Sequence, residues 1–274
     1  MTRTDAAALF NPMGTTALVT GASSGLGVGY AHELARRGAD LVLTARRLDR
    51  LEALAVELAE KYGTVSTVIP LDLADPGAVT ELVRDLAERG VRVGTLVNNA
   101  GFGHYGSVVD APADRVHGQV AVNVAALTDL SHALLPGLLT AALTHPHGAA
   151  LVNVASTAAF QPVPRLAVYA ATKAYVLSLT EALWYETRGT GLKVTAVCPG
   201  PTDTEFYAVA HRSQAGPRRV MSVDEVVSGT FAALDRQATP PHVVTGTSNR
   251  LVAWLAGVSP RRTVVTVTGR LSRR

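Results

Sequence analysis

The chain has 274 residues, of which 47% are hydrophobic, so it can form one large α/β domain or two small ones. No linker, repeat or low-complexity run divides it, and we predict a single domain over residues 1–274. The formal charge is only +3. No run reaches the ~20 apolar residues of a membrane-spanning helix, so we expect a cytoplasmic protein.

The residue types exclude further classes of protein. Cys198 is the only cysteine, so no internal disulfide is possible, and its apolar surroundings before Pro199 favour a core position over a nucleophile. No cluster of metal-binding side chains is visible, and we predict no metal. Arginines are concentrated in the last third without interleaved aromatic residues, so we expect no nucleic-acid partner.

Short apolar runs alternate with helical patterns from one end of the chain to the other. Continuous apolar strands are typical of a sheet that helices cover on both faces. Repeated strand, helix, strand order with right-handed crossovers predicts a doubly wound α/β fold (a Rossmann fold) with about seven parallel strands. The expected strands are residues 16–19, 40–44, 66–70, 95–98, 150–155, 193–198 and 242–245. Two helix starts are also predicted, one capped by Asp75 before Pro76 and one by a capping box of Ser222 and Glu225.

The first expected strand runs into a glycine-rich turn, Thr20-Gly-Ala-Ser-Ser-Gly-Leu-Gly27. Glycines at positions 21, 25 and 27 permit a tight turn, close approach of a phosphate and close helix packing. A helix from Gly25 to about Arg37 would then direct its N-terminal amides at a pyrophosphate. Because strand, turn and helix occur in the required order, the motif predicts a dinucleotide site. Its contacts are Gly21, Ser23, Ser24, Gly25, Leu26 and Gly27.

The second expected strand ends in Ala45-Arg46-Arg47, where an NAD site would place an acid to hold the ribose 2′-hydroxyl. No acid stands there, and guanidinium groups suit a 2′-phosphate through paired, charge-assisted hydrogen bonds. We therefore predict NADP(H) rather than NAD(H), with Arg46 as the main contact and Arg47 as a further one.

Tyr169 and Lys173 lie four residues apart, thirteen and seventeen positions after Ser156, and on a helix they share one face. A free tyrosine has a pKa near ~10, and lowering that pKa by about three units requires roughly 4 kcal/mol. One cation at ~4 Å supplies about that much at an effective dielectric near ~20. Such a pair also occurs on ordinary helix surfaces. The independent glycine-rich turn favours a catalytic phenol.

With these motifs the chain resembles the short-chain dehydrogenase/reductase family along nearly its whole length, and in particular its NADP-preferring carbonyl or 3-ketoacyl reductases. The resemblance rests on the glycine-rich turn, on Asn98-Asn-Ala-Gly101, on Asn123, on the set Ser156, Tyr169 and Lys173, and on Pro199-Gly-Pro-Thr202. Many NADP-using relatives carry a basic residue where this chain has Ser24, so the preference for NADP(H) over NAD(H) is expected to be weaker than the family average.

The resemblance implies a role for each matching residue. Tyr169 would be the proton acid in reduction and the base in oxidation, and Ser156 would hydrogen-bond the substrate oxygen. Lys173 would lower the tyrosine pKa and, with Tyr169, contact the cofactor; Asn123 would hold a water that relays protons. Further implied cofactor contacts are Asp72 and Leu73 at the adenine, Asn98, Ala100 and Gly101 at the ribose and sheet edge, and Pro199, Gly200 and Thr202 at the nicotinamide.

The loops expected around the substrate are mostly apolar and aromatic, which favours a hydrophobic ketone or aldehyde. They contain Phe102, His104, Tyr105 and residues 160–163 and 205–219, and we expect residues 203–220 to form a lid. Arginines 212, 218 and 219 are expected to be solvated lid charges, with an acidic carrier such as an acyl thioester as the alternative.

The C-terminal extension, residues 248–274, contains the apolar stretch 251–258 followed by Arg261 and Arg262. It suits a helix on a membrane surface, a cover for the substrate pocket or a subunit interface, and we favour packing over membrane contact. Long apolar helices over residues 122–143 and 167–188 resemble those that form family dimers, which implies a homodimer or homotetramer.

The predicted function is NADPH-dependent, reversible reduction of a hydrophobic ketone or aldehyde to the alcohol, with Tyr169 as acid and base. Two alternatives remain open: a catalytically silent NADP-binding sensor or scaffold, and epimerase or dehydratase chemistry on the same site. A pure binder needs no activated phenol, so the intact set of Ser156, Tyr169 and Lys173 favours redox chemistry.

Overall fold

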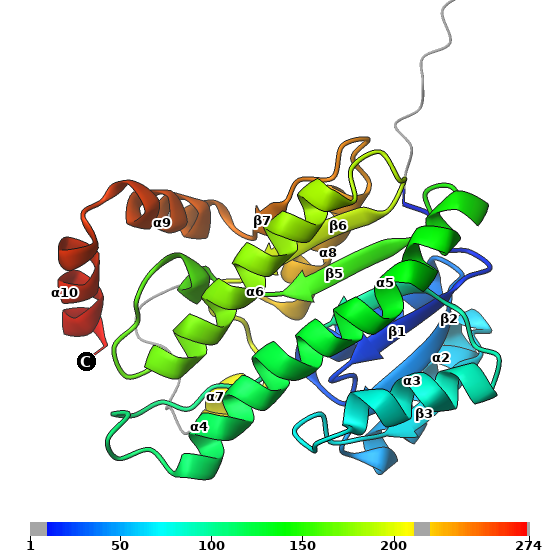
Figure 1. Ribbon diagram of the computed structural model, residues 1–274, viewed down its shortest axis with the longest axis horizontal. Helices are drawn as coiled ribbons and strands as arrows, with labels where there is room; N and C mark the ends of the chain where they lie inside the picture. The colour runs from blue at the N-terminus through cyan, green and yellow to red at the C-terminus, as the bar shows by residue number, and fades with distance from the viewer. Residues whose placement is uncertain (1–9, 211–219, 273–274) are drawn as a thin grey trace, which may run out of the picture.

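The fold is built on a parallel sheet of seven strands in the order β3-β2-β1-β4-β5-β6-β7, which confirms the doubly wound prediction (Figure 1). The computed structural model describes residues 10–210 and 220–272. Every expected strand is present, with ends displaced by two residues at most. The strands are β1 (Thr16–Thr20), β2 (Asp40–Ala45), β3 (Ser66–Pro70), β4 (Val93–Asn98), β5 (Ala150–Val154), β6 (Lys193–Cys198) and β7 (His242–Val244).

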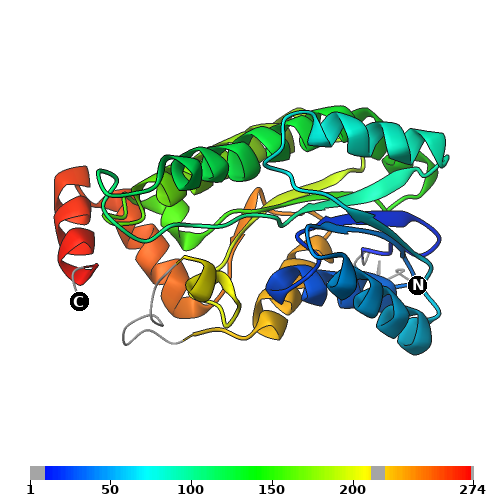
Figure 2. The same ribbon diagram turned by 90° about the horizontal axis from the view of Figure 1, so that it is seen from below.

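Helices cover the sheet in two layers, which lie on opposite sides of it in Figure 2. One layer contains α1 (Gly25–Arg36), α2 (Leu48–Tyr62) and α8 (Val223–Leu234). The other contains α3 (Ala78–Glu88), α4 (Ala113–Val120), the π-helical turn η1 (Ala121–Ala126), α5 (Leu127–Thr144) and α6 (Ala167–Glu186). Every residue of β4, β5 and β6 is buried, because both faces of these strands are covered.

The helix starts agree with the sequence at α8 but not at α3. At α8 the capping box is present, with Ser222 Oγ accepting from the Glu225 amide and the Glu225 carboxylate accepting from the Ser222 amide. The prediction that Asp75 caps α3 is wrong. Asp75 lies in a turn whose carbonyl accepts from the Ala78 amide, and Gly77, at φ +85°, redirects the chain before the helix begins.

Helices α4, η1 and α5 form one continuous helical run from Ala113 to Thr144. By length and composition alone this run is apolar enough to cross a membrane. Leu130 and Leu138, however, are buried in the core between α5 and the sheet, as expected of a helix that covers a sheet.

The C-terminal extension forms two helices beyond the last strand, α9 (Thr247–Val258) and α10 (Arg261–Leu271). Figures 1 and 2 show both at one end of the molecule, away from the α1 and α2 layer. Helix α9 contacts β7 and the 3-10 turn η2 (Thr157–Phe160). The end of α10 is tied to the body where the Tyr105 hydroxyl donates to the Ser272 carbonyl.

Candidate active site

The carboxyl ends of the central strands open into a cavity of about 830 Å³. A parallel doubly wound sheet binds its ligands at this edge. Most residues predicted for the site line the cavity, namely Gly21, Ser23, Ser24, Gly25, Leu26, Arg46, Arg47, Asp72, Leu73, Ala100, Gly101, Ser156, Tyr169, Lys173, Pro199, Gly200 and Thr202. Three predicted residues lie outside its wall: Gly27, Asn98 and Asn123.

The glycine-rich turn is shaped for a diphosphate. Gly21 has φ +66°, and a Cβ there would lie 2.9 Å from the Ala100 Cα. A Cβ on Gly27 would lie 2.2 Å from the Gly21 carbonyl oxygen, so Gly27 serves close packing within the turn rather than the cavity wall. The first turn of α1 has neither a side-chain cap from Ser24 nor an acidic residue. Its amide donors therefore suit a pyrophosphate.

The arginines after β2 are already paired with acids. Arg46, whose side chain is 71% exposed, has Nη1 3.7 Å from Asp72 Oδ2. Arg47 donates to Ser23 Oγ and, at 2.8 Å, to Glu205 Oε2, while Arg50 donates to Glu205 Oε1 at 2.6 Å. Hydrogen bonds from these two guanidinium groups lower the pKa of Glu205 to about 2. Glu205 is therefore ionised at neutral pH.

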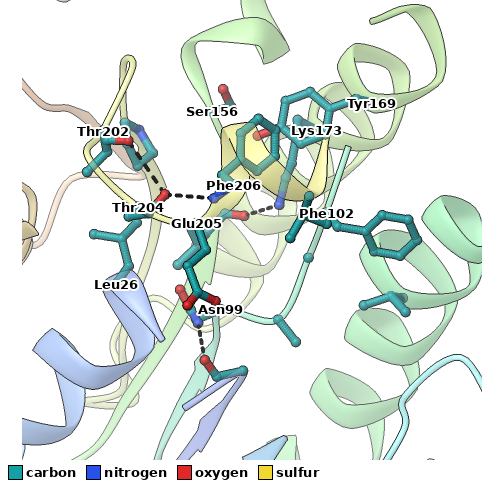
Figure 3. A pocket seen from close by; sticks show the side chains of 18 of the residues that line it. Leu26, Asn99, Phe102, Ser156, Tyr169, Lys173, Thr202, Thr204, Glu205 and Phe206 are labelled. Carbon is teal, nitrogen blue, oxygen red and sulfur yellow. Dashed lines mark hydrogen bonds between the residues drawn. The ribbon is translucent and has the colours of Figure 1, made fainter. Parts of the chain in front are cut away.

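Ser156, Tyr169 and Lys173 meet at the wall of the cavity, as Figure 3 shows. Ser156 follows β5 and begins η2, where its Oγ accepts from the Ala158 amide at 3.1 Å. Tyr169 and Lys173 belong to the first two turns of α6, and the ammonium lies 5.8 Å from the centre of the phenol ring. The Phe206 ring packs 5.1 Å from the Tyr169 ring. The predicted catalytic set is thus assembled around one space.

Lys173 is buried, with Nζ donating to the Val154 carbonyl at 2.7 Å. Burial lowers the pKa of Lys173 to about 8, because the ammonium has lost most of its water. A negative charge beside it would favour the ammonium again. The lysine and an ionised phenol therefore stabilise each other, whereas the lysine alone is a costly buried charge.

Asn123 supports the site from behind. It lies in η1 and is fully buried, and its Nδ2 donates to the Phe102 carbonyl and to Thr172 Oγ1 while its Oδ1 accepts from the Phe102 amide. A Cβ on Gly101 would lie 3.0 Å from Asn123 Oδ1 and 3.2 Å from Lys173 Nζ. Asn123 therefore holds the backbone next to Lys173, and its role with a relay water stays a prediction.

The side chain of Asn98 does not line the cavity, so its contact with the cofactor stays a prediction. Asn98 is buried, and its Nδ2 donates to Ser131 Oγ and Asn153 Oδ1, so it joins β4 to β5 and α5. Asn99 lines the cavity instead and donates to the Thr20 carbonyl at 2.9 Å. The two asparagines differ in this way because neighbouring side chains leave a strand end in opposite directions.

The sequence placed Thr204 only within the expected lid and gave it no contact of its own. Thr204 lines the cavity and stands where a Cβ on Gly25 would meet its Cγ2 at 2.9 Å. Thr202 is largely buried with its hydroxyl donating to the Gly200 carbonyl, so its contact with the carboxamide stays a prediction. The position of Thr204 beside the start of α1 indicates that the segment after Pro199 reaches back to the diphosphate end.

The part of the cavity beyond the expected cofactor contacts is here called the substrate half. Its walls include the apolar side chains Phe102, Val163, Leu166, Phe206, Val209 and, from α10, Leu271, and the cavity is also lined by the polar residues Asp114, Arg115, Gln161 and Thr268. The expectation that His104, Tyr105 and Phe160 also line it is wrong: the Tyr105 hydroxyl is bound to the Ser272 carbonyl, and the Phe160 ring faces His242 at 5.6 Å. Of the expected lid, α7 (Phe206–Val209) is described, whereas Arg212, Arg218 and Arg219 lie outside the described residues.

Cys198 is buried, and burial raises the pKa of its thiol to about 12, in agreement with a core position. The residues that the structure describes contain no group of three metal-binding side chains.

A dinucleotide turn joined to a Ser, Tyr and Lys set defines an oxidoreductase that uses NAD(P)H and acts on CH–OH groups. The short chain dehydrogenase family matches residues 15–215, and the chain belongs to that family. Sulfoacetaldehyde reductase 2 of Chromohalobacter salexigens is 39% identical over 202 residues, which cover 72% of this chain and 76% of the relative.

Two solved structures extend the comparison. A short-chain dehydrogenase from Sphingobium yanoikuyae in complex with NADPH is 36% identical, with a TM-score of 0.77 over 88% of this chain and 91% of that one. The bulky-bulky ketone specific alcohol dehydrogenase from Comamonas testosteroni is 33% identical, with a TM-score of 0.72 over 84% and 85% of the two chains. The chain is thus an oxidoreductase that interconverts carbonyls and alcohols with NAD(P)H.

Proposed function

We propose that the protein is an NADPH-dependent reductase of hydrophobic ketones or aldehydes, reversible toward alcohol oxidation. The observation that carries the proposal is the meeting of Ser156, Tyr169 and Lys173 beside an apolar cavity wall. The match to an NADPH complex supports the cofactor, and the match to a ketone-specific dehydrogenase supports the substrate class.

In this mechanism, bound NADPH would supply the hydride to the carbonyl carbon. The Ser156 hydroxyl donates a hydrogen bond to the carbonyl oxygen, where negative charge develops. The Tyr169 hydroxyl gives its proton to that oxygen as the C=O π bond breaks and the new C–H bond forms. Lys173, held by the Val154 carbonyl, then stabilises the phenolate until a proton from water restores it.

The direct test is NADPH consumption with a panel of ketones, aldehydes, steroids and acyl thioesters, run in parallel with NADH. Stoichiometric conversion of a hydrophobic carbonyl to its alcohol would support the proposal. Cofactor binding without turnover across the panel would favour a sensor, and product formation without net NADPH loss would favour an epimerase or dehydratase.

Arg46 should decide much of the cofactor preference, because its guanidinium is exposed at the cavity wall beside β2. Arg46→Asp is expected to raise the Kd of NADPH at least about 10-fold, through loss of one charged hydrogen-bond donor and gain of a like charge. The Kd of NADH should change much less. The measurement is fluorescence titration of each cofactor, with Arg84→Asp on α3 as a control of equal charge change. Equal changes for both cofactors would contradict the prediction.

Glu205 should weaken NADPH binding, because its ionised carboxylate occupies hydrogen-bond donors of Arg47 and Arg50. Glu205→Gln removes one negative charge beside the expected 2′-phosphate. We expect the Kd of NADPH to fall about 3- to 10-fold, the modest effect of an exposed ion pair, with that of NADH unchanged. Asp203→Asn, two residues away and outside the cavity wall, is the charge-matched control. Weaker NADPH binding in Glu205→Gln would show instead that Glu205 positions Arg47 for the phosphate.

We also infer a homo-oligomer, as the resemblance to family dimers implies. The helices expected at its interface expose large side chains, including Leu143 on α5 and Tyr175 and Tyr185 on α6. Exposed apolar surface on neighbouring helices suits contact with a second copy.

A further inference from the structure

The C-terminal region differs from the rest of the chain in charge. Residues 236–274 contain seven arginines and no Asp or Glu, which leaves 18 basic and 22 acidic residues, a net charge of −4, in residues 1–235. The C-terminal segment 236–274 is thus strongly cationic, whereas the rest of the chain is slightly acidic. Such a segment favours contact with an anionic surface.

The outward face of α9 is apolar. Leu251, Trp254, Leu255 and Val258 recur at intervals of three and four residues, so they share one helix face, and they are 57, 62, 45 and 62% exposed. Ala253 is buried in the core, so α9 is anchored and presents the apolar face outward. A helix that only covers the protein normally turns polar residues outward. The predicted packing of the C-terminal extension therefore explains the inner face of α9 but not its exposed apolar face.

Exposed arginines lie near this apolar face along the chain. Arg250 lies within α9, Arg261 and Arg262 begin α10, and Arg270 lies in the last turn of α10. An apolar stripe containing Trp and Leu, in a segment that carries several arginines and no acids, is the pattern of a helix that lies in the headgroup region of an anionic membrane.

The position of the cavity favours a membrane over a second copy of the chain as the partner. Thr268 and Leu271 of α10 line the cavity, so α10 belongs both to the cationic segment and to the substrate wall. A second copy seated across α9 and α10 would lie over this side of the substrate site. A lipid surface would instead bring a membrane-dissolved carbonyl compound to the apolar half of the cavity.

We propose that the α9–α10 surface, formed by Leu251, Trp254, Leu255 and Val258 of α9 together with the exposed arginines of α9 and α10 (Arg250, Arg261, Arg262 and Arg270), docks the protein on an anionic lipid surface. Docking is peripheral and reversible, through burial of the α9 stripe and attraction of the arginines to lipid headgroups. The docking itself is independent of the enzymatic activity; only the delivery of a membrane-dissolved substrate rests on the proposed function.

The experiment is co-sedimentation with vesicles of phosphatidylcholine containing phosphatidylserine, compared with vesicles of phosphatidylcholine alone, at physiological salt. The wild-type protein should partition at least about 10-fold more strongly onto the anionic vesicles. In a Trp184→Phe background, Trp254 is the remaining tryptophan, and its fluorescence emission should shift to shorter wavelength on binding.

Two variants separate the two contributions. Trp254→Ser with Leu255→Ser should reduce partition at least about 10-fold, and Arg261→Gln with Arg262→Gln should remove most of the preference for anionic vesicles. Val56→Ser, which removes an exposed apolar side chain from α2, should leave partition unchanged. Because all these side chains are exposed, the variants should fold, and their unfolding temperatures check this.

Three outcomes would overturn the proposal. The wild-type protein stays in the supernatant with anionic vesicles, or Val56→Ser weakens partition as much as the α9 variant does. The third outcome is that light scattering shows loss of a subunit contact in the α9 variant while its partition onto vesicles is unaffected. In that case a second copy of the chain covers α9. None of these readouts uses turnover, so failure of the docking proposal is distinguishable from failure of the proposed reductase activity.

Discussion

Replacing Tyr169 by Phe is expected to lower kcat by about 10²- to 10⁴-fold, the range for loss of a general acid. The change removes one hydroxyl and keeps the ring that packs against Phe206, so the cavity wall should persist. The Kd of NADPH should change little. The measurements are NADPH consumption with the best substrate of the panel and cofactor titration by fluorescence.

The matched control for this variant is Tyr175→Phe. Tyr175 lies on the same helix, and its hydroxyl forms a hydrogen bond with Thr128 Oγ1 outside the cavity wall. The Tyr175→Phe variant should retain near wild-type kcat. Full turnover by Tyr169→Phe would remove the phenol from the mechanism, whereas loss of both turnover and cofactor binding would indicate a structural role.

Lys173→Met is expected to lower kcat by about 10²-fold or more, because a phenolate would then form in an apolar wall without its cation. It should also change how stability depends on pH. The lysine pKa is lowered from 10.5 to about 8 in the folded protein by burial. Below pH 8 the lysine is protonated in both states, and the folded protein bears the full cost of the buried ammonium.

That cost disappears as the pH rises. Between pH 8 and 10.5 the unfolded chain binds more protons at this site than the folded one, so stability rises with pH. The wild-type protein should therefore gain about 3 kcal/mol relative to Lys173→Met over this interval, the free-energy equivalent of the pKa shift. Urea unfolding of the cofactor-free proteins across this pH range measures the difference.

Lys61→Met on α2 provides the comparison, since it removes an exposed lysine and so measures the general effect of losing one positive charge. If stability of the wild-type protein fell relative to Lys173→Met as the pH rose, the folded state would be stabilised by the ammonium rather than burdened by it. That result would show that partners in the folded state outweigh the loss of hydration.

The strands and the local motifs could be predicted because their signals are local. A strand buried on both faces is a continuous apolar run, and each of the seven runs became a strand of the sheet. The glycine-rich turn, and Tyr169 with Lys173 on one helix face, depend on residues at most a few positions apart. The predicted cap of α3 at Asp75 was wrong, because Gly77 adopts a left-handed conformation and the helix begins only after it.

The pairing of the arginines could not be predicted from the sequence. The segment after β2 lacks an acid, yet Glu205, 158 residues after Arg47, reaches its guanidinium, and Asp72 from the end of β3 approaches Arg46. Asn98 and Asn99 likewise differ only in the direction in which each side chain leaves the strand end. The role of α10 in the cavity wall follows from the path of the chain beyond β7.

By itself, the sequence determined the class of fold, the dinucleotide turn, the placement of Tyr169 and Lys173 on one helix face, and the cationic character of the C-terminal region. These properties follow from hydrophobic period, from glycine conformations and from residue spacing along one helix or strand. Only the tertiary structure decided which acids meet the arginines, which side chains line the substrate half, and that the apolar stripe of α9 faces outward. These are contacts between segments distant in the chain, whose geometry depends on how the sheet and its helices pack together.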